Sequence, residues 1–582
     1  MVVTPASPVA HQLSRMRTRS LVNAWRLVRS GDVAGLGRRL VARVTRLGAD
    51  RPVRYPAWRR HHVLLTDADR ERIADLAARL TKRPSFTLVV EVGANTDPGL
   101  LGATLESVAA QAWPEWVVYL ATDADLADGL TDNLTAAVAS VGDARVRVTG
   151  PGQAALGDWA AWVPVGDLLH EACLFALAHD VTHTPGAALA YTDNDHVDAR
   201  GRHSLPHTKP DWNPDLLMGQ DYLGGLVVYR QDVIAGAAGS ETPHERALRT
   251  TADLTAAQVL HVPHVLYSAR IGPGGLGWTE GTHVTWPVPD PAPKVSVLIP
   301  TRDQGRLLEK CVASLIGDSA TTEYPNLELV LVDHESTEPC ARAVIDSLAA
   351  DPAHTVVTFS GPFNFAAMVN RAAEAATGEL FLLLNNDTEA ISSDWLAEMV
   401  GQLSRPEVGV VGALLLFSDG TIQHAGVHPG VGGLMGHGHK HRRGDDPGYF
   451  GRLTVAHDVA AVTGACLGIT RANWERLGGL DEEHLAVAYN DIDLCLRART
   501  AGLRVVFTPH AVLHHHESLS RGFDNDPARN ERLAGEVAAM RERWGDLLAV
   551  DPAYSPNLAL TGRDFTLAEQ PRMEPVWRMR CD

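Results

Sequence analysis

The chain of 582 residues contains few cysteines, and none of them forms a paired pattern. Six cysteines are scattered without a C-x-x-C spacing, which predicts reduced thiols and excludes a disulfide framework or a thiolate zinc site. No apolar run is long enough to cross a bilayer, and the first residues lack the apolar core of a signal peptide. We therefore expect a cytoplasmic protein of several domains.

A phosphate-binding loop of the form G-x-x-x-x-G-K-[ST] is also missing. A literal G-x-G-x-x-G occurs at residues 272–277, but a Trp, a Thr, a Gly and then a series of prolines follow it. Such residues cannot open the helix that a dinucleotide site needs. We interpret residues 271–293 as an interdomain linker. Any bound diphosphate would then need a metal ion to balance its charge.

The net charge of −18 conceals a basic N-terminus. Residues 1–60 hold 13 arginines and two aspartates, a net charge of +11, which leaves −29 for the rest of the chain. Apolar residues recur at helical spacing among these arginines. Two interpretations follow: helices that lie on an anionic membrane surface, or a basic helical hairpin that docks on the acidic body of the same protein. Little else favours nucleic-acid binding.

One order of predicted elements occurs twice. Each copy has a strand, a helix, an aromatic-Pro pair and a second strand that ends in an aspartate, Asp123 in the first copy and Asp333 in the second. Duplication of one nucleotide-binding-like α/β unit is the economical explanation. The predicted organisation is a basic helical segment (1–85), a first α/β domain (86–270), the linker (271–293), a second α/β domain (294–525) and a helical C-terminal extension (526–582).

The apolar run 381–384 predicts a strand buried on both faces, and it ends in Asn385, Asn386 and Asp387. Open α/β sheets bind ligands at the carboxyl ends of their strands. Hard divalent cations prefer oxygen ligands, so Asp387 beside two amides would hold Mg²⁺ or Mn²⁺ against a diphosphate. The alternative is a polar β-turn whose side chains serve only as caps.

Further polar residues are expected along the same edge of the second domain. Thr301, Asp303 and Asp333 follow neighbouring predicted strands, where carboxylates can accept hydrogen bonds from a base imide and from ribose hydroxyls. A predicted helix would add contacts from the side through Asn364, Asn370 and Arg371.

Asp491 falls in the first turn of a predicted helix, whose dipole favours an ionised carboxylate. Such a carboxylate in a cleft can act as a general base, although a purely helix-stabilising charge is equally consistent. Three consecutive histidines, 514–516, alternate along an extended chain, so one or two of them would complete a metal shell. For the loop 437–441, which holds three more histidines, adventitious metal binding or solvation competes with a lid or acceptor-site role.

From Lys294 to about Asp564 the sequence resembles the inverting family-2 glycosyltransferases of the GT-A fold, particularly bacterial rhamnosyltransferases and O-antigen or cell-wall polysaccharide enzymes. The segments that carry the resemblance are 299–303 (IPTRD), 332–337 (VDHEST), 384–389 (LNNDTE), 423–426 (QHAG), 448–451 (GYFG), 462–466 (VTGAC), 490–497 (NDIDLCLR) and 515–518 (HHES). The resemblance implies an α/β protein of two tandem GT-A-like domains with helical N- and C-terminal segments.

The resemblance also implies roles. Asp333 would bind the nucleotide base, Asp491 would be the catalytic base, and Asp387 and His515 would be metal ligands. Asn385 stands where the first aspartate of the family's Asp-x-Asp motif is usual. The expected donor-binding residues are Pro300, Thr301, Asp303, Asp333, Asn364, Asn370, Arg371, Asn385 and Asn386.

The first copy resembles the same family at residues 191–195 and 209–217, but Pro164 and either Val165 or Gly166 stand where polar ligands are expected. We interpret it as a degenerate, inactive transferase domain, with an active second transferase as the alternative.

The predicted function is transfer of a sugar from a nucleotide sugar to a glycan or lipid-linked acceptor in cell-surface polysaccharide synthesis, with Mg²⁺ or Mn²⁺ as cofactor. The competing class is a non-catalytic scaffold or carbohydrate-binding protein. We expect no nucleic-acid partner, and we expect a cytoplasmic location with peripheral contact to the inner face of the plasma membrane if the basic N-terminus binds lipid.

Overall fold

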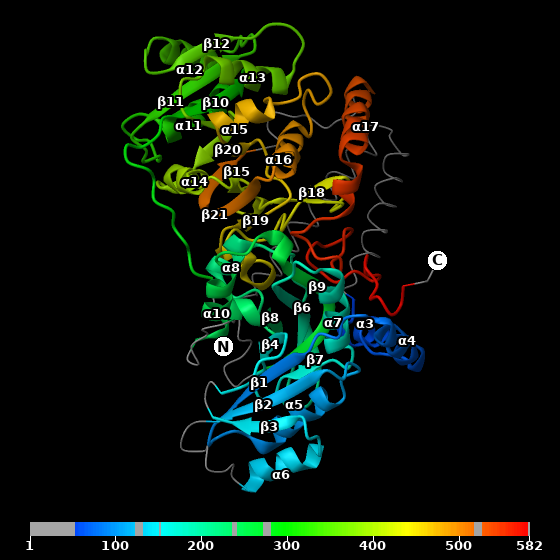
Figure 1. Cartoon of the computed structure of the whole chain (residues 1–582). Coiled ribbons are helices and arrows are strands. Elements are labelled where there is room, and N and C mark those ends of the chain that lie inside the picture. The colour runs from blue at the N-terminus through cyan, green and yellow to red at the C-terminus, as the bar shows by residue number, and fades with distance from the viewer. Residues whose placement is uncertain are drawn as a thin grey trace, which may run out of the picture.

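The computed structural model describes residues 53–122, 132–150, 153–234, 241–271, 281–516 and 527–579. Most of the basic segment lies outside these residues, so both of its interpretations stay predictions. Figure 1 shows two α/β domains, the first in blue to green and the second in green to orange. No helix among the described residues is both long enough and apolar enough to cross a membrane.

Each domain contains one large mixed sheet. The first sheet has the order β3 (Val146–Thr149), β2 (Trp116–Thr122), β1 (Phe86–Val92), β4 (Trp159–Trp162), β8 (Val227–Arg230), β6 (Leu189–Val197), β9 (Val259–Arg270) and β5 (Leu168–Leu169), and β7 (His203–His207) pairs with β6. The second has the order β12 (Thr355–Thr358), β11 (Leu327–Asp333), β10 (Val295–Thr301), β13 (Leu380–Leu384), β20 (Cys466–Thr470), β15 (Val408–Leu416), β21 (Arg504–His515) and β14 (Thr388–Ala390). There β16 (Ile422–His424) pairs with β15, β19 (His457–Asp458) pairs with β21, and β17 (Val427–Pro429) forms a separate hairpin with β18 (Met435–His437).

The two sheets share their topology as well as their size. In both, the first strand in the chain, β1 or β10, is parallel to its two neighbours in the sheet. The strand that follows on one side, β8 or β20, is antiparallel, and a short antiparallel strand, β5 or β14, closes that edge. The tandem pair of α/β domains predicted from the sequence is therefore confirmed. Strands β10 and β13 are buried at every residue, as expected for parallel strands covered by helices on both faces.

Helices cover both sheets (Figure 1). In the first domain they are α3 (Tyr55–His62), α4 (Asp67–Arg79), α5 (Pro98–Ala109), α6 (Asp132–Val141), α7 (Cys173–His183), α8 (Pro214–Gly219), α9 (Gln231–Ile234), α10 (Pro243–Thr251) and the 3₁₀ turn Ala256–Gln258. In the second they are α11 (Gly305–Leu315), α12 (Pro339–Ala349), α13 (Phe365–Ala375), α14 (Trp395–Leu403), the 3₁₀ turn Tyr449–Thr454, α15 (Arg471–Leu477), α16 (Asn490–Thr500) and α17 (Pro527–Ala549).

A buried charge cluster joins the domains. Asp215 of α8 accepts hydrogen bonds at 2.7 and 2.8 Å from Arg405 and lies 2.9 Å from Arg504, both in the second domain. Close packing adds to this contact, because a Cβ at Gly219 would come within 2.5 Å of Val455. Buried charges of opposite sign thus meet across the contact between the two domains.

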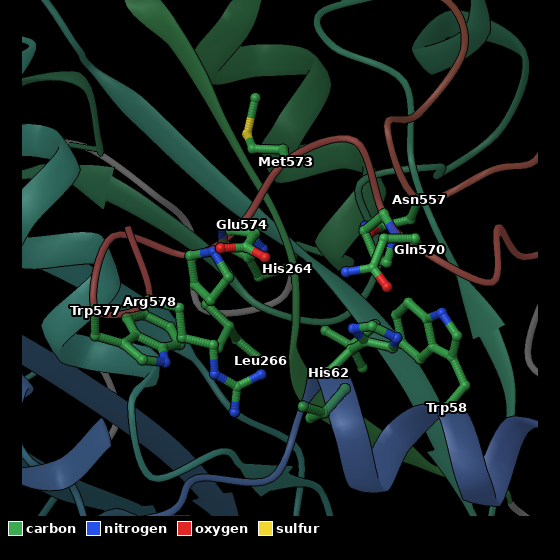
Figure 2. Close-up of a pocket in the computed structure, with 14 residues that line it drawn as sticks. Trp58, His62, His264, Leu266, Asn557, Gln570, Met573, Glu574, Trp577 and Arg578 are labelled. Atoms are coloured by element: carbon green, nitrogen blue, oxygen red, sulfur yellow. The ribbon is translucent and has the colours of Figure 1, made fainter. Parts of the chain in front are cut away.

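The C-terminal extension is helical only in its first part. After α17 the chain returns to the first domain as an irregular tail, and Figure 2 shows its Trp577 on one side of His264 and its Asn557 and Gln570 on the other, above Trp58 of α3. The Asn557 amide donates to Asp193 at 2.9 Å, and Trp577 is buried in the core of the first domain. The cavity under this tail measures about 40 Å³, too small for a sugar, so the contact is structural.

Candidate active site

A cavity of about 630 Å³ opens at the carboxyl ends of β10 and β13, a size typical of small-molecule sites. It collects residues from segments far apart in the second domain. Of the site residues predicted from the sequence, those that line it are Pro300, Thr301, Asp303, Asn385, Asn386, Asp387, Asp491 and His515. The others, Asp333, Asn364, Asn370 and Arg371, lie outside its lining.

Asp387 and His515 meet in the lining of this cavity. The edge strand β14 pairs Thr388 with His515, which brings the Nε2 atom of His515 to 3.1 Å from Oδ1 of Asp387. The amide nitrogen of Asn385 lies 3.2 Å from the same ring nitrogen. Asn385 also forms the predicted turn through its backbone, because its carbonyl accepts hydrogen bonds from the N–H and hydroxyl of Thr388. The turn and the clustering of side chains therefore coexist.

Gln423 of β16 orients His515. The Nδ1–H of the ring donates to Oε1 of Gln423 at 2.6 Å, and both side chains are almost fully buried. This contact selects the tautomer whose Nε2 lone pair faces Asp387, which is the form that binds metals. Sequence reasoning noted Gln423 only as part of a family segment and gave it no role. Its local signal is weak, because the three-residue strand Ile-Gln-His holds a second polar side chain, His424.

The donors at this place fit a hard divalent cation that shares its shell with a ligand. Within the ranges that the structure describes, no three His, Cys, Asp or Glu side chains gather in a way that would hold a metal alone. Asp387 and His515 supply one carboxylate and one imidazole, with the amide of Asn385 beside them. Mg²⁺ commonly binds through one or two carboxylates and completes its shell with water and phosphate oxygens.

Asp491 enters the cavity from the first turn of α16. Its Oδ2 accepts the backbone N–H of Gly464 at 2.6 Å, and its Oδ1 accepts that of Ile492 at 2.8 Å. We expected the helix dipole to favour the ionised form, but burial outweighs these donors and raises the pKa of Asp491. A carboxylate with a raised pKa is a stronger base, so the change suits proton abstraction.

The loops after β10 and β11 use their aspartates to hold themselves together. Oδ1 of Asp303 accepts the backbone N–H groups of Thr337 and Glu338, and these hydrogen bonds lower the pKa of Asp303. Asp333 is buried, accepts the N–H of Ser336 at 3.0 Å and pairs with Arg342 at 2.7 Å. Asp333 therefore lies next to the cavity with both carboxylate oxygens engaged.

The predicted side contacts are used elsewhere in the fold. The amides of Asn364 and Asn370 donate to the carbonyls of Glu482 and Leu480 and so anchor that loop. Arg371 is exposed and pairs with Glu374 at 2.7 Å. The structure does not bring these three residues to the cavity.

The histidine-rich loop is not simply solvated. His437 lines the cavity, and its Nδ1 lies 2.9 Å from Nδ1 of the buried His424. His439 is buried and stacks on Phe565 with ring centroids 4.0 Å apart, so solvation is the wrong interpretation for this residue. Burial lowers the pKa of His437 to about 4, which makes it a neutral hydrogen-bonding group at neutral pH.

The corresponding place in the first domain has different chemistry. The edge strand β5 pairs Leu168 with Ser268, as β14 pairs Thr388 with His515, so a serine occupies the histidine position. Asp167 precedes β5 as Asp387 precedes β14, but its carboxylate accepts the hydroxyl of Tyr267 at 2.6 Å. Burial raises the pKa of Asp167 to about 6. These features favour the degenerate interpretation of the first copy.

Comparison with known proteins shows what the second domain is similar to. Residues 296–472 match the family model described as Glycosyl transferase family 2. Asp491 and His515 lie beyond the matched residues.

Two curated relatives match over most of this chain. It is 36% identical over 553 residues to "Uncharacterized protein y4gI" of Sinorhizobium fredii, which covers 85% of this chain and 60% of the relative. It is 35% identical over 569 residues to "O-antigen biosynthesis protein RfbC" of Myxococcus xanthus, which covers 89% of this chain and 43% of the relative. The chain thus spans only part of each.

Two solved structures resemble part of the chain. One is the mannosyltransferase PcManGT from Pyrobaculum calidifontis in complex with GDP-Man and Mn²⁺, with a TM-score of 0.32, 22% identity, and coverage of 44% of this chain and 68% of that one. The other is GalNAc-T7 with UDP, GalNAc and Mn²⁺, with a TM-score of 0.34, 16% identity, and coverage of 44% and 49%. At these TM-scores neither likeness supports a conclusion about this chain.

Proposed function

We propose that the chain is a metal-dependent inverting glycosyltransferase. It moves a hexosyl or deoxyhexosyl group from a nucleotide sugar to a hydroxyl of a glycan or lipid-linked acceptor in cell-surface polysaccharide synthesis. The observation that carries the proposal is the convergence of Asp387, His515 and Asp491 on one cavity, in a domain of which residues 296–472 match the Glycosyl transferase family 2 model. The name of the Myxococcus relative supports a role in O-antigen-like polymers.

Asp387 and His515 would hold Mg²⁺ or Mn²⁺, which when bound supplies charge that stabilises a departing diphosphate. The chain's own contribution is to hold these ligands ready before the donor arrives. Gln423 fixes the ring of His515, and the amide of Asn386 donates to the hydroxyl of Thr301 at 2.8 Å. Ligands fixed in this way lose less conformational entropy on binding.

Asp491 would take the proton of the acceptor hydroxyl. In a single displacement, the hydroxyl oxygen forms its bond to the anomeric carbon while the bond from that carbon to the diphosphate oxygen breaks. The proton passes to the carboxylate of Asp491, and the configuration at the anomeric carbon inverts. Hydrogen bonds from Gly464 and Ile492 orient the carboxylate, and its raised pKa favours proton uptake.

The cavity has two chemically different ends. One is formed by the loop after β10, with Thr301 and Asp303, and suits the hydroxyl-rich nucleotide. The other includes Val427, Met435 and His437 of the β17–β18 hairpin, in which Val427 pairs with His437. We assign the donor to the first end and the acceptor to the second, with the metal ligands between them.

A direct test is binding and turnover by the full chain across a panel of nucleotide sugars. With Mn²⁺ present, at least one nucleotide sugar should raise the melting temperature and undergo slow hydrolysis, and EDTA should abolish both effects. Stabilisation by a glycan without any nucleotide-sugar effect would instead favour a non-catalytic carbohydrate-binding protein. Asn385 favours this second candidate, because it replaces the first aspartate that is usual in the family's metal-binding motif.

A further inference from the structure

Phe363 is an apolar ring displayed to solvent at the donor end of the cavity. It lines the cavity, yet 46% of its surface is exposed, whereas the neighbouring Phe365 is half-buried against the core. Because the ring lines the cavity, a ligand bound at this end would cover its exposed face. Phe363 packs on His334, whose backbone N–H donates to the carbonyl of Thr301, so the ring belongs to the end of the cavity formed by the loop after β10.

The ring is held firmly from behind. His334 is buried and stacks on Phe363, with ring centroids 5.8 Å apart and an angle of 27° between the ring planes. Its Nε2 contacts the carbonyl of Gly361 at 2.9 Å, and its backbone N–H donates to the carbonyl of Thr301. On the other side, Asn364 caps α13 by accepting the N–H of Ala367 at 2.9 Å. One face of the ring is therefore supported by the fold.

The carboxylate expected to contact the base is less open than this ring. Asp333 is buried, and its two oxygens are engaged by Ser336 and Arg342. A flat heterocycle that enters the donor end would meet Phe363 as its aromatic surface. Aromatic side chains stack on any base because every base has a π-face, and the contact needs no particular hydrogen-bond pattern.

We propose that Phe363 is the stacking platform for the nucleobase of the donor, with His334 supporting it. The inference rests on the proposed function, because it assumes a nucleotide at this end of the cavity. It assigns binding energy for the nucleoside to Phe363 and leaves the diphosphate to the metal site. Stacking of this kind improves affinity for every base, so the selection between bases must come from other groups.

The test separates base from diphosphate. Calorimetry with Mn²⁺ measures the affinity of the full chain for UDP, GDP and dTDP, and for pyrophosphate, which lacks a base. Phe363→Ala should weaken the affinity for the nucleotide that the wild type binds by roughly tenfold to a hundredfold, and leave the affinity for pyrophosphate unchanged. Phe363→Trp should retain the affinity and show quenching of the new indole, whereas Phe363→Leu, which keeps apolar bulk without a ring, should resemble the alanine variant.

Phe359 provides a matched control, because it also contacts His334, at 5.6 Å between centroids, and does not line the cavity. Phe359→Leu should leave nucleotide affinity near that of the wild type. Unchanged nucleotide affinity in Phe363→Ala, or an equal loss for pyrophosphate, would overturn the assignment of Phe363 and leave the proposed function intact. A wild-type chain that binds none of the nucleotides would overturn the proposed function as well.

Discussion

The ring of His515 donates its Nδ1 hydrogen to Oε1 of Gln423 over 2.6 Å, and the opposite nitrogen faces Asp387 at 3.1 Å. Gln423 and His515 are 92 residues apart in the chain. This relationship links the interior of the second domain to the proposed metal site, because the glutamine determines which ring nitrogen is free to coordinate.

Gln423→Ala should therefore weaken Mn²⁺ affinity by roughly 10- to 100-fold, the usual effect of removing a partner behind a metal-binding histidine. Gln423→Glu should recover much of the loss, since its carboxylate still accepts the Nδ1 hydrogen. Titration of Mn²⁺ against donor hydrolysis measures the effect. Equal Mn²⁺ affinity in the alanine variant and the wild type would show that the glutamine plays no part.

Asp387→Ala and His515→Ala should each reduce Mn²⁺-dependent binding of nucleotide sugar, because each removes one of the two ionic or imidazole ligands. His516→Ala is the matched control, since His516 follows in the chain but contacts Glu389 at 2.9 Å instead. Thermal shift with and without Mn²⁺ reports the result. If both cavity variants keep the full metal dependence, the metal binds elsewhere.

Asp491→Asn should lower turnover by roughly 10²- to 10⁴-fold, the typical contribution of a general base, while donor affinity stays near normal. Because burial raises the pKa of Asp491, the rate in the wild type should fall with decreasing pH at a higher pH than for an ordinary aspartate. A variant with normal turnover would exclude Asp491 as the base.

The same substitution has an expected effect on stability. A folded-state pKa above the unfolded value means that the protonated form is favoured on folding, and that stability is lost as the pH rises through the folded pKa. At neutral pH Asp491→Asn removes the cost of the buried charge but loses one of the two hydrogen bonds from Gly464 and Ile492, so its melting temperature should stay close to that of the wild type. A loss of turnover together with a lower melting temperature would point to misfolding instead.

The interdomain cluster predicts a large cost for losing its acid. Asp215→Ala would leave the buried Arg405 without its bidentate partner, a change that costs about 3–5 kcal/mol in comparable buried pairs, whereas Arg504 keeps its pair with Asp458 at 2.7 Å. Urea unfolding measures it. Glu374→Ala, which breaks the exposed pair with Arg371, should cost about 1 kcal/mol or less. Similar urea midpoints for Asp215→Ala and Glu374→Ala would show that the interdomain contact of Asp215 adds little to stability.

The basic N-terminus can be tested by a deletion that respects the fold. Tyr55 of α3 donates to the buried Asp195 at 2.6 Å, so the deletion should end at residue 52. If the arginines bind anionic lipid, the shortened chain should bind anionic liposomes less well at low salt, because each basic residue near the surface contributes roughly 1 kcal/mol. Donor hydrolysis should be unchanged. Equal liposome binding by both chains would favour docking on the acidic body.

Several features of this protein can be read from local sequence patterns. The apolar run 381–384 followed by Asn385, Asn386 and Asp387 indicates a buried strand and the place where it ends. Polar residues that follow parallel strands gather at one sheet edge, which is why Thr301 and Asp387 line one cavity as expected. The repeated order of elements indicates two similar sheets, because the same order of strands and helices occurs twice in the chain.

Only the tertiary structure decided which polar groups remain available for a ligand. The sequence predicts that Asp333 ends a strand. It does not show that Arg342 and Ser336 engage the two carboxylate oxygens of Asp333. It gives no reason to connect Gln423 with His515, or the tail residue Asn557 with Asp193, which lies 364 residues earlier. Periodicity reports how a segment meets its immediate surroundings, whereas hydrogen-bond partners and burial depend on segments that are distant in the chain and meet only when it folds.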